Sequence, residues 1–154
     1  MQLSEFLDFD SIKSSLSGGN KRSLLQQLAQ AAAQRLGREP AEILASVVER
    51  ERLGSTGFGQ GVAIPHGKIE GLTQIFGMFA RLSEPIDYKA IDGAPVDLVF
   101  LLLSPPDAGA DHLKALAAVS RVTRHAPTLE KMRGARSRDA LAAVLLGADE
   151  RDAA

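Results

Sequence analysis

The stretch Gly54-Ser55-Thr56-Gly57-Phe58-Gly59-Gln60-Gly61-Val62-Ala63-Ile64-Pro65-His66 decides how this chain is interpreted. It combines four glycines with two hydroxyl side chains and a histidine that directly follows a proline. The glycines at alternate positions 57, 59 and 61 allow positive φ and a close approach of the backbone to a ligand, so we expect inward-pointing N–H groups. The run Val62-Ala63-Ile64 predicts a short buried strand, which the following proline keeps extended.

The histidine at the end of this stretch is a candidate phosphoryl acceptor. His66 lies at the end of the expected strand between Pro65 and Gly67, which predicts an exposed, oriented ring nitrogen. A neutral imidazole, with a usual pKa of about 6.5, keeps a lone pair available at neutral pH. Phosphoryl transfer needs in-line positioning and charge stabilisation, which backbone amides, hydroxyls and an arginine such as Arg50 supply. The alternative is a histidine that only satisfies a turn. The candidate phosphate loop consists of Ser55, Thr56, Gly57 and Gly59.

Different site chemistries fit the sequence less well. The glycine pattern follows a helix and leads into a strand, which is the reverse of the dinucleotide-binding order. Gly67-Lys68 is followed by Ile69, where a P-loop has a hydroxyl side chain that holds magnesium. The three histidines lack the spacing of metal ligands, so we expect no metal and no cofactor. His112 lies in the first turn of an expected helix, where the helix dipole favours a neutral ring, and His125 is interpreted as the C-terminal cap of that helix.

Composition limits the class of protein. The chain has 154 residues, of which 45% are hydrophobic, and this predicts one domain over residues 1–154 with an ordered core at about 3–147. Eighteen basic and 19 acidic residues give a net charge of -1, so no global field favours nucleic acid. Absence of cysteine excludes disulfides and thiolate nucleophiles.

An acidic N-terminus and a longest apolar run of only Leu98 to Leu103 favour a soluble, cytoplasmic protein without membrane insertion. The residues of one basic cluster are interrupted by acidic neighbours and are interpreted as a solvated helix surface: Lys131, Arg133, Arg136 and Arg138.

Hydrophobic periodicity predicts helices around a small central sheet. A short helical turn and an edge strand are expected within Leu3 to Leu16, and helices from Asn20 to Gly37 and from Pro40 to Gly54. Strands are expected at Ile75–Leu82 and Val96–Leu103, joined by a long turn-rich connection from Ser83 to Pro95. The remaining expectations are a helix over Asp111–His125, a helix from Thr128, and a last helix with Ala140, Leu141, Val144 and Leu145 turned inward.

The run Gly-Ser-Thr-Gly-x-Gly-x-Gly-x-Ala-Ile-Pro-His-Gly-Lys at residues 54–68 resembles the active-site signature of a known family. These are the enzyme IIA proteins of the phosphoenolpyruvate-dependent phosphotransferase system, mannitol and fructose class, and the resemblance is greatest to the nitrogen regulatory branch. Further matches extend it over nearly the whole chain: Arg50-Glu51, Glu70, the run Ile91-Asp92-Gly93-x-Pro95-Val96-Asp97-Leu98, and His112-Leu113-x-x-Leu116. The resemblance implies the α/β (α+β) fold of the mannitol-type enzyme IIA, a mixed central sheet flanked by helices.

The resemblance also implies a role for each matched residue. His66 would accept the phosphoryl group, as a tele-phosphohistidine, from an HPr-like phosphocarrier protein of the nitrogen branch, with enzyme I upstream. His112 would lie beside it and hydrogen-bond the phosphoryl group or orient the ring, and Arg50 would offset the negative charge. Glu70 matches an acidic residue near the histidine and has a secondary role.

Several classes of function remain open at this level. The leading one is a phosphoryl carrier, rather than a stand-alone turnover enzyme, whose phosphorylation state is read by partner proteins. By resemblance, potassium transporters and sensor kinases are such partners. Absence of an attached transporter, a IIB-type cysteine domain and a membrane segment favours regulation over a fructose- or mannitol-specific IIA component that passes phosphate to a IIB protein. Two further classes are a binding module without covalent chemistry and a hydrolase, for which no base is evident.

Overall fold

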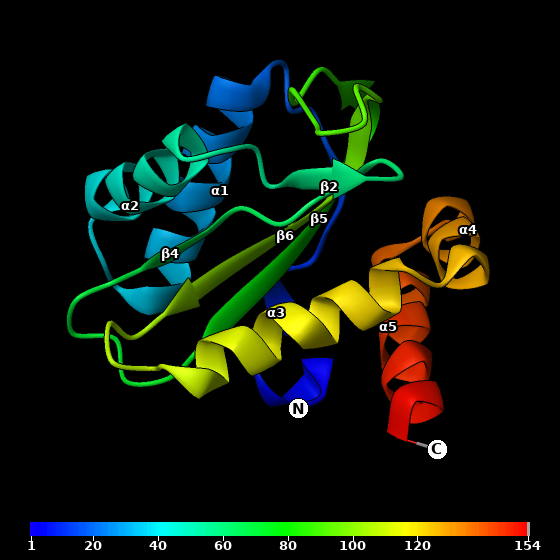
Figure 1. Ribbon diagram of the computed structural model, residues 1–154. Coiled ribbons are helices and arrows are strands. Elements are labelled where there is room, and N and C mark those ends of the chain that lie inside the picture. The colour runs from blue at the N-terminus through cyan, green and yellow to red at the C-terminus, as the bar shows by residue number, and fades with distance from the viewer. Residues whose placement is uncertain (154) are drawn as a thin grey trace.

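The computed structural model describes the backbone of residues 1–153 and the side chains of residues 1–149. A mixed sheet of six strands forms the centre, with the order β1-β5-β6-β3-β2 and with β4 also paired to β6 (Figure 1). β1 runs parallel to β5, and β3 and β4 run parallel to β6, whereas β5 is antiparallel to β6 and β2 is antiparallel to β3. The strands are β1 (Lys13–Leu16), β2 (Gly57–Gly59), β3 (Val62–Ala63), β4 (His66–Lys68), β5 (Phe76–Ile86) and β6 (Val96–Ser104).

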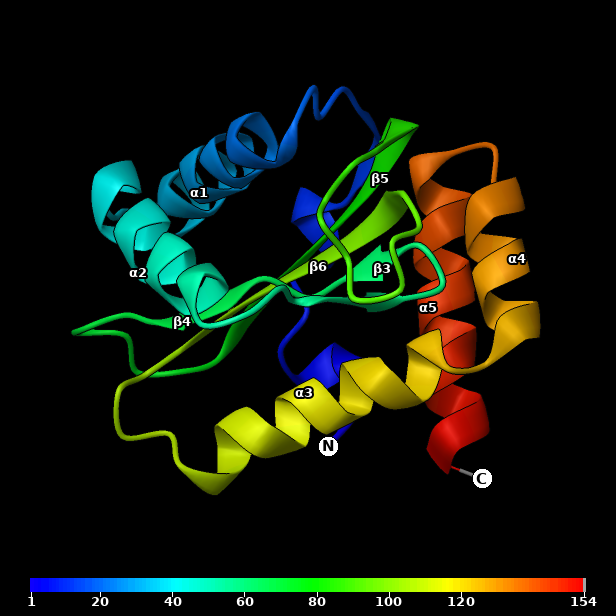
Figure 2. The same ribbon diagram turned by 45° about the horizontal axis from the view of Figure 1, so that its top comes forward.

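Helices cover both faces of this sheet, as expected from the sequence. α1 (Lys21–Leu36) and α2 (Pro40–Arg52) lie on one face, and α3 (Ala110–Thr123), α4 (Ala126–Gly134) and α5 (Arg138–Ala153) lie on the other (Figures 1 and 2). Two short 3-10 helices, Leu3–Glu5 and Phe9–Ser11, precede β1 at one edge of the sheet. The predicted mixed sheet between helical layers is therefore confirmed.

The central strand β6 explains why two cores form. Its side chains alternate between the two layers, so that Leu98, Phe100 and Leu102 join the core under α3–α5. Val99 and Leu101 join the core under α1 and α2. All five are buried, which is the expected consequence of a nearly continuous apolar run covered on both faces.

The ends of the first two helices follow the sequence signals. The Asn20 side chain accepts a hydrogen bond from the Ser23 backbone N–H at 2.8 Å and begins α1. Gly37 ends α1 with a positive φ of 65°, which a glycine adopts without strain. Pro40 occupies the first turn of α2, where no backbone donor is lost. The beginning and end of α1 and the beginning of α2 were thus predictable from the sequence.

Four local expectations were wrong. β5 continues to Ile86, so the turn-rich connection is shorter than the predicted one. α4 begins at Ala126, because Pro127 fits the first turn of a helix instead of preventing one. His125 is the N-cap residue of α4, with its ring Nδ1 2.8 Å from the Thr128 hydroxyl. It does not cap α3, which ends at Thr123 with Arg124 as its C-cap residue. Ala140 is exposed, although Leu141 and Leu145 of the same helix are buried.

Among the residues that the structure describes, no helix combines the length and the hydrophobicity needed to cross a bilayer.

Candidate functional site

His66 is held at the beginning of β4, in the middle of the molecule. It pairs in register with Leu102 of β6, so the position of its backbone is fixed by the central strand. Gly67 lets α2 come close, because a Cβ atom at this position would lie 2.5 Å from Ser46 Oγ. The residue is only 8% exposed, and the prediction of an exposed ring at a strand end was wrong. The small neighbour brings a helix over the histidine instead of opening it to solvent.

The two ring nitrogens of His66 have different partners. Nδ1 lies 2.8 Å from the Ile64 carbonyl oxygen, which can only accept, so Nδ1 carries the proton. Nε2 therefore has the lone pair, and it accepts a hydrogen bond from Arg50 Nε at 3.1 Å. Burial lowers the pKa of His66, as does the positive charge of Arg50, while the bond to Ile64 raises it. The result is a neutral imidazole with Nε2 available as a nucleophile.

Arg50 reaches this nitrogen from the last turn of α2. Its Nη1 donates to the Gly54 carbonyl oxygen at 2.9 Å, while its Nε donates to His66. A cation at the C-terminal end of a helix is favoured by the helix dipole. The guanidinium is therefore fixed next to Nε2 and retains donors for an incoming anion.

The second histidine lies beside the first. The ring centroids of His66 and His112 are 5.4 Å apart, and His112 is in the first turn of α3, as predicted. Its Nδ1 lies 2.6 Å from the hydroxyl of Ser104, the last residue of β6. Burial lowers the pKa of His112, and the electrostatic interactions with His66 and Lys68 act in the same direction. Ser104 was not predicted; its only signal is that a polar residue ends the apolar run of β6.

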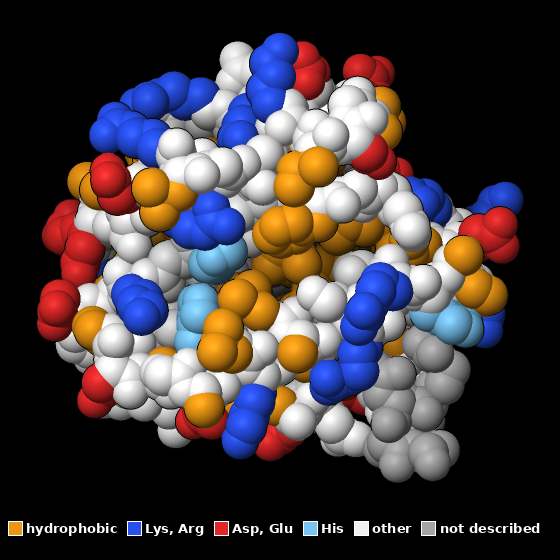
Figure 3. All heavy atoms as spheres, viewed as in Figure 1, with side chains coloured by type: hydrophobic (Ala, Val, Ile, Leu, Met, Phe, Trp, Pro, Cys, Tyr) orange, Lys and Arg blue, Asp and Glu red, His pale blue; other side chains and the backbone are white. Residues whose placement is uncertain are grey.

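Arg50, His66 and His112 border a hollow of 350 Å³, which Leu53 and Lys68 also line. A second hollow of 460 Å³ lies between the β2–β3 hairpin and α3, with Phe58 and Ile64 among its lining residues. Figure 3 shows two histidine side chains together beneath a cationic side chain, at the edge of a hydrophobic depression. The face therefore combines a nucleophile, cations and an apolar surface.

The glycine-rich segment forms a hairpin instead of a cradle around the histidine. Gly57–Gly59 is strand β2, antiparallel to β3. Thr56 is fully buried, and its hydroxyl donates to Glu51 and lies 3.0 Å from the Tyr88 hydroxyl, while the Ser55 hydroxyl accepts from the Gly57 N–H. None of Ser55, Thr56, Gly57 and Gly59 is among the described residues that line the hollow beside His66. The structure brings together Arg50, His66 and His112, but it does not bring the predicted phosphate loop to them.

The tip of this hairpin is clamped from both sides. Gln60, with a φ of 60°, donates its backbone N–H to Asp92 at 3.1 Å and accepts at its carbonyl oxygen from Arg133 Nη2 at 2.7 Å. Arg133 also forms a bidentate ion pair with Asp97, at 2.9 Å from Nε and from Nη2. Gly61 has a φ of 79°, and a Cβ atom there would collide with the Arg133 guanidinium. The glycines thus serve the turn and its clamp.

Two further sequence expectations concern peripheral residues. Glu70 is exposed, its backbone carbonyl accepts from Arg38, and it is not among the described residues that border the hollow. Within the described side chains, no group of three or more histidine, cysteine, aspartate or glutamate residues could hold a metal ion.

Comparison with known proteins identifies the family. Residues 5–147 match the model of the phosphoenolpyruvate-dependent sugar phosphotransferase system, EIIA 2. A nitrogen regulatory protein of Bradyrhizobium diazoefficiens is 46% identical over 145 residues, covering 94% of this chain and 95% of the relative.

Solved structures agree with this result. The crystal structure of the nitrogen regulatory protein IIA-Ntr from Neisseria meningitidis superposes with a TM-score of 0.87 at 34% identity, covering 93% of this chain and 98% of that one. The complex of enzyme IIAMTL and phosphorylated enzyme IIBMTL from Escherichia coli shares the fold, with a TM-score of 0.75, 15% identity and coverage of 90% and 95%. The chain belongs to the EIIA 2 family of the phosphoenolpyruvate-dependent sugar phosphotransferase system, as a IIA component of its nitrogen regulatory branch.

Proposed function

We propose that this protein is a phosphocarrier that accepts a phosphoryl group on Nε2 of His66 from an HPr-like phosphohistidine protein. The observation that carries the proposal is the buried, neutral imidazole whose tautomer is fixed by Ile64 and whose Nε2 lone pair faces Arg50. An uncharged nitrogen with an oriented lone pair is what nucleophilic attack on phosphorus requires. The proposal treats residues 1–154 as one such domain.

The transfer needs little besides alignment. The N–P bond of the donor breaks and its electron pair returns to the donor imidazole, while the Nε2 lone pair of His66 forms the new N–P bond. The proton on Nδ1 stays in its hydrogen bond to the Ile64 carbonyl oxygen, which stabilises the positive charge that the phosphorylated ring acquires. Most of the work is positioning and charge stabilisation, in agreement with the general chemistry of phosphoryl transfer.

Arg50 and His112 supply the charge stabilisation. As the phosphoryl group arrives at Nε2, the Arg50 guanidinium transfers its donor from that nitrogen to a phosphoryl oxygen, because the lone pair is no longer available. His112 donates from Nε2 to another oxygen when the Ser104 hydroxyl donates to its Nδ1. Positively charged or neutral donors aimed at the developing charge are the usual means of such catalysis.

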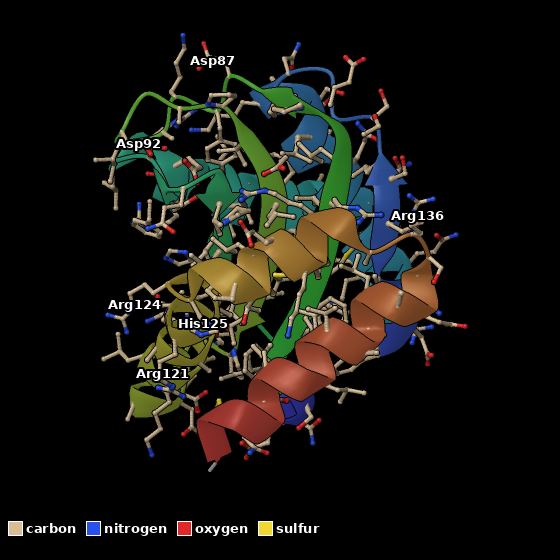
Figure 4. The ribbon with its side chains drawn as sticks, turned by 90° about the vertical axis from the view of Figure 1, so that its right-hand side faces the viewer. Asp87, Asp92, Arg121, Arg124, His125 and Arg136 are labelled. Carbon is tan, nitrogen blue, oxygen red and sulfur yellow. The ribbon has the colours of Figure 1, made fainter. Side chains whose placement is uncertain are left out.

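The apolar surface around the site is where donor and regulated partners would dock. Leu53, Phe58 and Leu113 are exposed on it by 81%, 52% and 67%. Arg121 and Arg124 project from α3 on the same side of the molecule as Asp92 (Figure 4). A phosphoryl group adds negative charge to this surface, so phosphorylation would weaken some complexes and strengthen others. In this proposal the protein acts in the cytoplasm, and regulated partners include potassium transporters or sensor kinases, as the resemblance suggests.

A sugar-specific IIA component is the second candidate. The observation in its favour is the shared fold with enzyme IIAMTL, which was solved as a complex with phosphorylated enzyme IIBMTL. Incubation of the phosphorylated protein with fructose- or mannitol-specific IIB proteins distinguishes the two. Rapid loss of phosphate to a IIB protein would favour sugar transport, whereas stable retention of phosphate supports the regulatory function.

The central test is a labelling reaction with phosphoenolpyruvate, enzyme I and the nitrogen-branch HPr-like protein, followed by intact mass at alkaline pH. We expect one acid-labile phosphoryl group on the wild type, none on His66→Ala and slower labelling of His112→Ala. Failure to label the wild type, with a donor that labels another acceptor, would contradict the proposal. A non-covalent binding module would then be the better account, and it predicts that His66→Gln leaves partner binding intact.

A further inference from the structure

Glu51, which the mechanism above does not use, carries a buried and fully occupied carboxylate. Its side chain is 6% exposed, and it accepts hydrogen bonds from Lys21 Nζ at 2.8 Å and the Tyr88 hydroxyl at 2.9 Å. It also accepts from both the backbone N–H of Thr56, at 3.2 Å, and the Thr56 hydroxyl. Burial raises the pKa of Glu51, but the bonds from Lys21, Thr56 and Tyr88 outweigh it and lower the pKa. The carboxylate is thus ionised and joins three separate parts of the chain.

One chain of contacts leads from Glu51 to Nε2 of His66. The two bonds to Thr56 close the segment that leaves α2, so residues 53–55 form a short loop with fixed ends. Gly54 lies inside this loop, and its carbonyl oxygen accepts from Arg50 Nη1 at 2.9 Å. The other side of the same guanidinium donates to His66 Nε2 at 3.1 Å. The loop that Glu51 closes therefore sets the orientation of Arg50 on the nucleophilic nitrogen.

A second chain of contacts leads from Glu51 to Nδ1. The Thr56 carbonyl oxygen accepts from the Ile64 backbone N–H at 2.9 Å. The Ile64 carbonyl oxygen then accepts the Nδ1 proton of His66 at 2.8 Å. Thr56 thus holds the residue that fixes the tautomer, and Glu51 holds Thr56 on two atoms. Both nitrogens of His66 are oriented by a segment that one carboxylate anchors.

We propose that Glu51 is a positioning residue for phosphoryl transfer at His66, which acts through Thr56 on both ring nitrogens without touching the phosphoryl group. The inference rests on the proposed phosphocarrier function. Replacement of one carboxylate oxygen by an amide NH2 would leave two of the four donors on Glu51 without an acceptor and Lys21 without its counter-charge, and the buried network would rearrange. Small displacements of a reacting group are costly, because the rate depends steeply on alignment.

The primary test compares Glu51→Gln with Glu42→Gln, an exposed glutamate of the same helix that pairs with Arg38. Phosphorylation is followed at several concentrations of the phosphorylated HPr-like donor. We expect Glu51→Gln to lower the rate at saturating donor by about tenfold or more, with an unchanged half-saturating concentration of donor. Glu42→Gln should match the wild type. A folded Glu51→Gln protein with a wild-type saturating rate would overturn the proposal.

Two further variants separate positioning from general stability. Thr56→Val keeps the backbone bond and the volume but removes the hydroxyl donor, and it should lower the saturating rate in the same way. Lys21→Gln removes a partner of Glu51 that lies outside both chains of contacts, so it should reduce stability without changing the rate. The reverse pattern, in which the rate follows the stability of each variant, would show a merely structural role.

The nitrogen chemical shifts of the His66 ring provide a readout that does not require phosphorylation. In the wild type, Nδ1 should have the shift of a protonated nitrogen and Nε2 that of a nitrogen with a lone pair. We expect Glu51→Gln to move both shifts towards those of a ring that exchanges between tautomers, while Lys21→Gln leaves them unchanged. Unchanged shifts in Glu51→Gln would contradict the positioning role. If the wild type accepts no phosphate, the proposed function fails, but these shifts still test whether Glu51 orients the ring.

Discussion

The two halves of the glycine-rich stretch from Gly54 to Gly61 differ in both composition and task. Residues 54–56 lie against the end of α2. The Gly54 carbonyl oxygen accepts a hydrogen bond from Arg50, and the backbone of Thr56 is hydrogen-bonded to Glu51 and to Ile64. Residues 57–61 form the hairpin, whose tip is fixed by Asp92 and Arg133. The first half determines the geometry of His66, whereas the second half determines the shape of the apolar surface beside it.

This difference teaches that glycine density alone does not locate a phosphate site. Gly61 is required because its φ is positive and a side chain would meet the Arg133 guanidinium. Gly57 is required because a Cβ atom would lie 2.8 Å from Ala90 Cβ. Both requirements come from packing of the protein against itself. In the proposed function, the donors for the phosphoryl group come instead from Arg50 and His112, which belong to helices.

The largest effect on the transfer rate is expected from removal of the Arg50 guanidinium, which bonds to Gly54 in the first half of the segment. Arg50→Ala should lower the rate of phosphoryl transfer to His66 by about 10²-fold to 10³-fold, because one donor aimed at the developing charge is lost. The time course of labelling by intact mass measures this. The control is Arg52→Ala, since Arg52 is two residues further along α2 and pairs with Glu49 at the exposed surface. Equal rates for Arg50→Ala and wild type would remove the distinction between the two halves.

The converse experiment changes the clamp of the second half. Arg133→Ala removes the bidentate pair with Asp97 and the bond to the Gln60 carbonyl oxygen, so we expect the free energy of unfolding to fall by about 1 to 2 kcal/mol. The transfer rate of the folded protein should change by less than about twofold, because neither of these contacts involves His66. Urea denaturation and labelling give the two numbers. Arg136, which projects from the opposite side of the molecule to Asp92, provides the control as Arg136→Ala (Figure 4). A strong loss of rate in Arg133→Ala would show that the hairpin also positions the histidine.

The fold was largely predictable because local signals and the apolar pattern agree. Asn20, Gly37 and Pro40 act at the helix ends where the sequence indicated, and the run in β6 is buried on both faces. Of the very short strands, β3 lies within the buried strand that was predicted at Val62-Ala63-Ile64. β2 and β4 were not predicted, since they have three residues each and depend on pairing with other strands. Pro127 was misjudged because a proline fits the first turn of a helix as well as a break between helices.

The site was predictable in part. His66, His112 and Arg50 were identified from the sequence, and the structure brings them together. The roles that were assigned to them in phosphoryl transfer stay predictions. Ser104 and the network of Glu51 were missed, because a hydrogen bond between residues on different elements leaves no periodic signal in the sequence. The burial of His66 was missed for the same reason: it depends on α2 and α3 covering β4.

A smaller effect is expected from Ser104, which supports the site from the sheet. Ser104→Ala removes the hydroxyl beside His112 Nδ1, so the ring of His112 is free to exchange tautomers and its Nε2 donates less often. We expect a loss of transfer rate of about threefold to tenfold, the usual size for one neutral hydrogen bond. Ring nitrogen shifts of His112 should change in parallel. Ser104→Thr retains a hydroxyl and serves as the control, and a full loss of rate in Ser104→Ala alone would point to a direct role for the hydroxyl.

The smallest expected effect is a dependence of the free energy of unfolding on pH, which arises from His66 and His112. Burial lowers the pKa of His66 and of His112 below the usual 6.5, so the unfolded chain binds protons more readily than the folded protein as pH falls through that value. The stabilisation is complete above pH 6.5 and is lost as pH decreases towards the lowered values. Glu51, with a usual pKa of 4.5 that is lowered here, contributes below this window.

Urea denaturation at pH 7.5 and 5.5 should therefore show lower stability at pH 5.5, with a smaller difference in His66→Gln. Arg133→Ala should keep the wild-type difference although it is less stable at both pH values, because neither His66 nor His112 belongs to the clamp. If His66→Gln instead retained the full pH dependence, the proton-linked part of the stability would lie outside His66, and the buried neutral ring would no longer distinguish the first half of the segment from the second.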